Sequence, residues 1–228
     1  LKNGNHLPSR IYYFLEGVTY SASGSKGVTF RYLPKNFLFD VGGSCIFPGE
    51  FKNVKYYLSF LNSKLSFYIA NCLNRTVNTQ VGDVKRVPFV IPTKEIENLV
   101  TSLTNLNVEI KKQSCTFKII ETNFEQSLLR SFHNQTLQDR AITYLNHENF
   151  QHALILLNEA IIDELVYEIY ELSDTDREQV EAKMGKSIGA LPVFKAAKDV
   201  FLAQLEDPVA IVIEHIQNLP ETEFNDEK

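Results

Sequence analysis

One amphipathic segment, set between two strand-like segments, most constrains how this chain can fold. Over residues 53–73 apolar side chains recur at steps of three and four, the repeat of a helix with one face in a core. A short apolar segment, 37–41, precedes it and is closed by Gly42 and Gly43, as a buried strand would be. Segments 77–81 and 84–91 follow it and favour strands by their β-branched content. This order predicts mixed strands and helices over residues 1–92.

The remaining pattern extends this α+β prediction. Segments 11–15 and 28–33 favour strands, and the loop 21–27 lies between them. Thr93 is a suitable N-cap for a helix over 93–115, whose narrow apolar seam (Leu99, Leu103 and Leu106) is typical of helix–helix packing. Residues 116–220 predict an all-α region, with helices near 124–132, 150–172, 173–185, 193–205 and 209–219. The acidic residues 221–228 predict a disordered tail.

Composition is that of a globular protein that does not enter a membrane. The 228 residues are 44% hydrophobic and 22% charged. The two most apolar helical segments contain charges, such as Lys64 and Asp163, that an ordinary membrane span excludes. The cysteines number three and form no Cys-x-x-Cys pair, which favours free thiols in a reducing, cytoplasmic compartment. Because the first residue is leucine and no secretory leader follows, we expect a piece of a longer cytoplasmic protein.

The net charge of −5 conceals two halves of opposite sign. Residues 1–115 hold 14 basic and 7 acidic side chains, a balance of +7, whereas residues 116–228 hold 9 and 21, a balance of −12. The basic half is the candidate for binding a polyanion, and the acidic half is not. An even spread of the +7 over the surface is equally compatible with composition.

Each candidate catalytic motif in the sequence lacks a residue or a spacing that its chemistry requires. The turn Phe39-Asp40-Val41-Gly42-Gly43-Ser44 is followed too soon by Phe47-Pro48-Gly49 to open a cofactor-binding helix. Gly185-Lys186-Ser187 lacks the earlier glycine of a phosphate loop. The five histidines have no metal-ligand spacing, and no Pro-Pro step exists for the motif by which some base-modifying enzymes hold a flipped base. We therefore expect no catalysis, bound metal or cofactor in this chain alone.

Two segments offer side chains suited to DNA. Residues 21–27 supply serines and a lysine for phosphate, and arginine and lysine follow closely; residues 74–80 supply the amides that pair with adenine. The candidate contacts are Ser23, Ser25, Lys26, Arg31, Tyr32, Lys35, Arg75, Asn78 and Gln80. A solvated hairpin loop and a polar strand facing water have the same composition, so the residues alone leave both interpretations open.

A family resemblance favours DNA binding. The segments 31–40, Asn74-Arg75-Thr76-Val77-Asn78-Thr79-Gln80-Val81-Gly82-Asp83 and Val87-Pro88-Phe89-Val90-Ile91-Pro92 resemble the target-recognition region of bacterial adenine-specific DNA methyltransferases. The resemblance is to BREX phage-defence enzymes and related type IIG-like enzymes, and is best over residues 17–112. Residues 61–65 resemble a helix that recurs in such domains, and residues 157–181 resemble a helical element near the C-termini of these enzymes.

The resemblance implies a division of the chain and of the enzyme. Residues 1–92 would be a target-recognition domain, 93–115 a spacer helix and 116–220 a helical C-terminal region. An upstream domain of the parent enzyme would transfer the methyl group of S-adenosylmethionine to N6 of adenine. Double-stranded DNA and other defence-system subunits would be the partners. The alternative is a protein-interaction module, in which the acidic helices and the Leu99–Leu103–Leu106 seam dock another subunit.

Overall fold

A computed structural model describes residues 10–23, 28–40, 42–49, 52–76, 78–130, 136–190 and 192–222. Contacts separate the chain into two units that are not continuous in sequence. Unit 1 comprises residues 1–104 and 162–185, and unit 2 comprises residues 105–161 and 186–228. Two long helices, α4 (Lys94–Thr116) and α5 (Leu137–Ile169), each contribute residues to both units.

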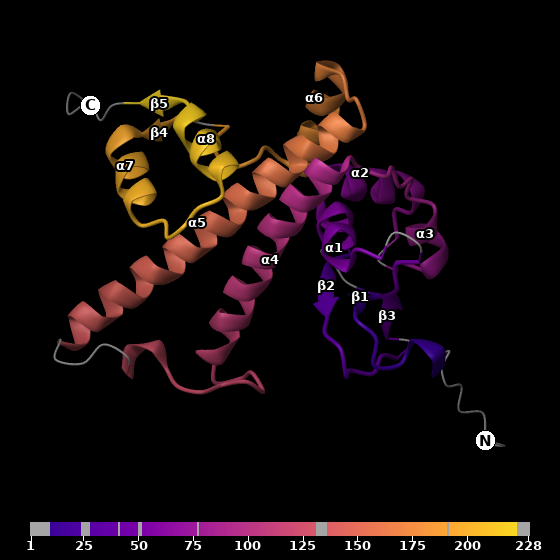
Figure 1. Ribbon diagram of the computed structural model, residues 1–228, viewed down its shortest axis with the longest axis horizontal. Coiled ribbons are helices and arrows are strands. Elements are labelled where there is room, and N and C mark those ends of the chain that lie inside the picture. The colour runs from indigo at the N-terminus through magenta and orange to yellow at the C-terminus, as the bar shows by residue number, and fades with distance from the viewer. Residues whose placement is uncertain are drawn as a thin grey trace. The chain divides into compact units, whose positions relative to one another are not determined.

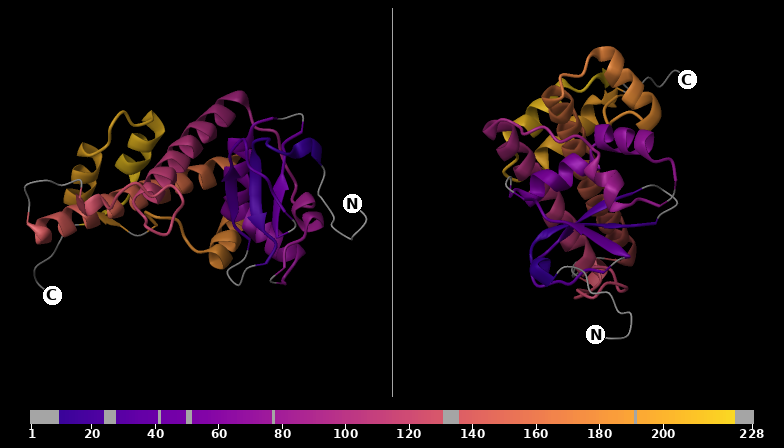
Figure 2. Two further views of the ribbon diagram at one scale, coloured as in Figure 1. Left: turned by 90° about the horizontal axis from the view of Figure 1, so that it is seen from below. Right: turned by 90° about the vertical axis from the view of Figure 1, so that its right-hand side faces the viewer.

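A small antiparallel sheet organises unit 1. Its strands lie in the order β2-β1-β3 (Figure 1 and Figure 2). They are β1 (Gly17–Ser21), β2 (Phe30–Leu33) and β3 (Gly43–Ile46). Val18 and Tyr20 are buried on the face toward helix α1 (Val54–Asn62), which packs against β1 and β2. Because side chains alternate along a strand, Thr19 and its cross-strand neighbour Arg31 share the other face.

The strands expected over 11–15 and 37–41 are wrong. The first segment forms the short 3-10 helix η1 (Arg10–Tyr12) and a turn; Phe37 and Leu38 are 56% and 59% exposed, and the strand begins only at Gly43. Phe14 and Asn36 adopt positive φ angles of 65° and 71°, which interrupt extended backbone at each segment. The Phe14 N–H donates to the Phe37 carbonyl at 3.2 Å, and the Asn36 N–H donates to the Phe14 carbonyl at 3.1 Å.

The single helix expected over 53–73 is two helices, α1 and α2 (Lys64–Leu73). Ser63 separates them in an extended conformation, with φ −67° and ψ 152°. Its hydroxyl donates to the Phe60 carbonyl at 2.7 Å and accepts from the Ser66 N–H at 3.3 Å, so that it caps the second helix. The buried Asp163 carboxylate accepts from the Lys64 N–H at 2.9 Å.

The strands expected over 77–81 and 84–91 are also wrong. Residues Val81–Lys85 form the short helix α3, and residues 88–93 have no strand pairing. The Asp83 carboxylate accepts from the Gln80 N–H at 2.9 Å, which favours a helical turn over a strand at this point. The Tyr170 hydroxyl then fixes the following segment, because it donates to the Pro88 carbonyl at 2.5 Å and accepts from the Val90 N–H at 3.2 Å.

Helix α4 and the end of α5 complete the core of unit 1. The expected N-cap is confirmed, since the Thr93 hydroxyl accepts from the Ile96 N–H at 3.3 Å. Val100 and Leu103 are fully buried in this unit, as is Val166 from α5. The expected helix 173–185 is confirmed as α6 (Asp174–Met184), which packs on α2, and Gly185 ends it with φ 85°.

Unit 2 contains the outer parts of both long helices and a small C-terminal module. The module comprises β4 (Val193–Phe194), α7 (Lys195–Ala203), α8 (Ala210–Asn218) and β5 (Glu221–Thr222), with β4 and β5 parallel. Glu221 and Thr222, expected in the disordered tail, thus form a strand, and residues 223–228 lie outside the described part. In place of the helix expected near 124–132 there is only the 3-10 helix η2 (Leu128–Arg130), and residues 131–135 are outside the description.

The α+β class with a helical C-terminal region is confirmed by these elements. The boundaries expected at residues 92 and 115 stay a prediction; contacts group residues 162–185 with the sheet. Among the described helices, none has both the length and the apolar character needed to cross a membrane.

Candidate nucleic-acid interface

The first candidate segment continues strand β1 beyond the sheet. Ser23 is exposed just after β1, and Arg31 is exposed on β2. The Arg31 guanidinium donates to the Ser21 hydroxyl at 2.7 Å, so its side chain extends toward the end of the sheet where Ser23 lies. Ser25 and Lys26, the other two candidates here, lie outside the described residues.

The second candidate segment, residues 74–80, is shaped by hydrogen bonds to its own backbone. The Asn74 amide donates to the Asn78 carbonyl at 2.9 Å and to the Asp83 carboxylate at 2.7 Å. The Thr76 hydroxyl donates to the same Asn78 carbonyl at 3.0 Å. Arg75, Asn78 and Gln80 are exposed, and Gln80 also forms a capping box with Asp83 at the start of α3.

The structure brings the two candidate segments together. The Thr79 N–H donates to the Ala22 carbonyl at 2.8 Å, and Ser23 and Asn78 form an antiparallel bridge. These segments are more than fifty residues apart in sequence, and their pairing places Ser23, Asn78 and the Arg31 side chain at one end of the sheet. Gln80 and Arg75 lie within three residues of Asn78 on the same exposed segment.

Lys35 and Tyr32 do not join this group. Lys35 is exposed in the turn after β2, at the opposite end of the β1–β2 pair from Ser23. Tyr32 lies on the face of the sheet toward α1, and the Lys55 ammonium sits 3.0 Å from its ring centroid as a cation–π pair. Lys55 is also 3.6 Å from the Glu16 carboxylate.

Asn74 and Asp83 support the structure of the second candidate segment, and the sequence analysis did not identify them. Hydrogen bonds from the Gln80 N–H and the Asn74 amide hold the pKa of the Asp83 carboxyl below its usual value. The carboxylate therefore stays charged and fixed beside the exposed amides. The spacing Gln80-x-x-Asp83 follows the capping-box arrangement and was the signal available in the sequence.

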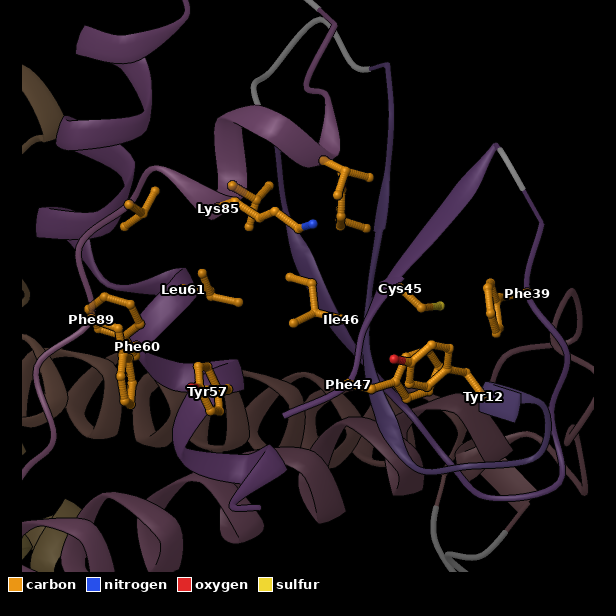
Figure 3. A pocket seen from close by; sticks show the side chains of 14 residues that line it. Tyr12, Phe39, Cys45, Ile46, Phe47, Tyr57, Phe60, Leu61, Lys85 and Phe89 are labelled. Atoms are coloured by element: carbon orange, nitrogen blue, oxygen red, sulfur yellow. The ribbon is translucent and has the colours of Figure 1, made fainter. Parts of the chain in front are cut away.

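An apolar pocket of about 450 Å³ opens in the same unit. Figure 3 shows Tyr57, Phe60 and Phe89 on one side of it, Tyr12, Phe39 and Phe47 on the other, and Lys85 between them. The rings are already paired: Tyr57 stacks on Phe89 with centroids 4.5 Å apart, and Tyr12 stacks on Phe47 at 4.9 Å. No Asp or Glu is among the described residues that line it.

Comparison with known proteins identifies relatives of the chain. No protein-family model matches it. It is 31% identical over 189 residues, 78% of its length, to the adenine-specific methyltransferase BrxX of Escherichia coli O9:H4 (strain HS). It is 25% identical over 170 residues, 71% of its length, to the adenine-specific methyltransferase PglX of Lacticaseibacillus casei (strain Zhang). The alignments span 15% and 14% of those proteins, so the chain is a homologue of a limited part of adenine-specific methyltransferases.

Proposed function

We propose that this chain recognises DNA sequence for an adenine-specific DNA methyltransferase that acts in defence against phage. The observation that carries the proposal is the pairing of Ser23 with Asn78, which unites two segments chosen for DNA-binding chemistry. The homology to adenine-specific methyltransferases supports it. In the parent enzyme, a domain outside this stretch would bind S-adenosylmethionine and transfer its methyl group to N6 of adenine.

Each exposed side chain has a role in this proposal. The amides of Asn78 and Gln80 would contact adenine edges in the major groove, where a side-chain amide can both donate and accept. Arg31 and Arg75 would bind phosphate or guanine, and the Ser23 hydroxyl would bind phosphate. Residues 1–92 would form the recognition domain, 93–115 the spacer, and 116–220 the region that docks other parts of the enzyme or other defence subunits.

The first test measures binding of the full chain to duplex DNA by fluorescence anisotropy across a salt series. Arg31→Gln should weaken binding to every sequence and, if Arg31 contacts phosphate, lower the salt slope by about one. After selection of the preferred sequence, Asn78→Ala and Gln80→Ala should each lose discrimination at one base pair, by about 1–3 kcal/mol.

Matched exposed residues outside the interface provide the controls. Asn98 is exposed on α4 and Arg130 is exposed in η2, so Asn98→Ala and Arg130→Gln should leave sequence preference and the apparent affinity nearly unchanged. Absence of duplex binding at low salt, or unchanged sequence preference in both amide variants, would contradict the proposal.

A second candidate function, docking of a protein partner, is favoured by exposed apolar side chains on α5. Leu137, Ile142 and Leu145 are 75%, 50% and 56% exposed near the start of this helix. The seam first considered for docking is not available as a whole, because Leu103 is fully buried within unit 1. Ile142→Glu with Leu145→Glu should weaken association with the rest of the parent enzyme in calorimetry, whereas the exposed Gln138→Glu should not; equal affinities would exclude this surface.

A further inference from the structure

A polar cavity of about 320 Å³ lies in unit 2, between the end of α4 and the middle of α5. Lys111, Ser114 and Lys118 line it from α4 and the turn that follows, and His147, Gln151 and His152 line it from α5. Lys111 and Ser114 lie three residues apart on α4, and His147 and Gln151 lie four residues apart on α5, so each pair shares one side of its helix; Lys118 follows the end of α4. The side chains therefore converge on one space from two directions.

The charges around this cavity are unbalanced. Among the described residues, neither Lys111 nor Lys118 forms a salt bridge, whereas the neighbouring Lys112 pairs with Glu109 at 2.7 Å. Glu148 is the only carboxylate among the described residues that line the cavity. Two ammonium groups without a salt bridge at one concave polar site favour an anionic ligand.

Gln151 adds an unsatisfied polar atom to the cavity lining. Its Oε1 atom is buried without a hydrogen-bond partner in the described structure. Buried polar atoms are nearly always paired, and an unpaired one calls for an explanation such as a bound molecule. A half turn of the amide exchanges Oε1 for Nε2, which presents two N–H donors to the same space.

We propose that this cavity binds a phosphate group, either of a nucleic-acid backbone or of a free phosphate compound. Lys111 and Lys118 would supply charge-assisted hydrogen bonds, and Ser114 and Gln151 would supply neutral donors. Each imidazole of His147 and His152 carries at least one N–H donor in any protonation state. The site goes beyond the proposed base recognition and does not depend on it, since its residues belong to unit 2.

Titration of the full chain with inorganic pyrophosphate, monitored by 1H–15N NMR, tests the site directly. Backbone amides of residues 110–118 and 147–155 should shift together. Lys111→Gln with Lys118→Gln should weaken binding by about tenfold for each ammonium lost. Both lysines are exposed, so the double variant should remain folded. Lys112→Gln is the matched control and should bind as the parent does, and Glu148→Gln should bind more tightly because it removes the carboxylate.

The salt dependence of duplex binding identifies the source of the phosphate. If the slope of log affinity for duplex DNA against log salt concentration is lower by about two in the double variant and unchanged in Lys112→Gln, the phosphate is that of the DNA backbone. Lost pyrophosphate binding with an unchanged slope would assign it to a free phosphate compound. If pyrophosphate binds but no variant or parent binds DNA, the site stands and the proposed function fails. Absence of pyrophosphate shifts together with an unchanged slope would overturn the site.

Discussion

At the scale of the residue, identical side chains have opposite roles in the candidate interface. Asn74 and Asn78 lie four residues apart, yet the Asn74 amide is used within the protein, on the Asn78 carbonyl and the Asp83 carboxylate, while the Asn78 side chain is exposed. Supporting the loop and contacting a base both require an amide, so the sequence indicates the segment but not which Asn has which role. Only the hydrogen-bond partners separate the supporting residue from the candidate base-contacting one.

The lowered pKa of Asp83 predicts a pH dependence of stability. Because the folded protein favours its carboxylate, Asp83 stabilises the fold above its ordinary pKa of 3.8, and this contribution is lost as the pH falls through the lowered folded value. Asp83→Asn should therefore lower the urea midpoint at pH 6 and have a smaller effect at pH 3. An equal difference between parent and variant at the two pH values would contradict the assignment.

Lys198 predicts a second effect at a single side chain. It is buried, and its ammonium donates to the Gln217 carbonyl at 2.6 Å, the Leu219 carbonyl at 3.3 Å and the Glu221 carboxylate at 2.7 Å. Lys198→Met leaves these acceptors without their donor and should destabilise the C-terminal module by about 2–3 kcal/mol. Thermal unfolding measures the loss, and Lys195→Met, at an exposed position on the same helix, should have little effect.

At the scale of the element, the helices with capping signals were predictable and the strands mostly were not. Thr93 acts as the N-cap that the sequence indicated, and the helix expected over 173–185 is capped by Ser173 and ends at Gly185. The apolar segment 37–41 has the composition of a strand, but the turn geometry at Asn36 and the exposure of Phe37 prevent it from joining the sheet. Strand propensity depends on a partner strand, which local sequence does not reveal.

The break at Ser63 shows why helix periodicity alone was insufficient. The apolar repeat continues across residues 53–73, because both α1 and α2 bury one face, whereas one contact at the break, from the Lys64 N–H to Asp163, joins residues about a hundred positions apart in sequence. Ser63→Ala removes the cap of α2 and should cost about 1 kcal/mol in urea unfolding. Ser102→Ala is the control, since the Ser102 hydroxyl bonds only to the Asn98 carbonyl of its own helix and is exposed. Equal costs for both variants would argue against a capping role.

At the scale of the whole molecule, the chain is two units joined by helices that belong to both. Residues 162–185 supply Val166 and Tyr167 to the core of unit 1, although they follow most of unit 2 in sequence. A division along the sequence into a recognition domain, spacer and helical region could not anticipate this, because long-range contacts leave no local periodic signal. The prediction of an α+β class succeeded because it depends only on which elements occur.

The discontinuous unit predicts how fragments behave. A fragment of residues 1–115 lacks Val166, Tyr167 and Asp163, so it should lose near-ultraviolet circular dichroism and amide dispersion in NMR spectra. A fragment of residues 1–185 retains all of unit 1 and should keep the native signals of the sheet. A well-dispersed spectrum for the shorter fragment would show that residues 162–185 are dispensable.

The hydrogen bonds of Asn74, Thr76 and Asp83 hold residues 74–80 without help from the side chains of Arg75 and Asn78, whereas Gln80 forms a capping box with Asp83. The residues that hold the loop are thus distinct from the exposed Arg75 and Asn78, which are available for contact with DNA. A library randomised only at Arg75 and Asn78 should retain the parent loop geometry, and members with altered DNA preference could be selected from it without redesign of the sheet. The loop would then serve as an exchangeable specificity cassette.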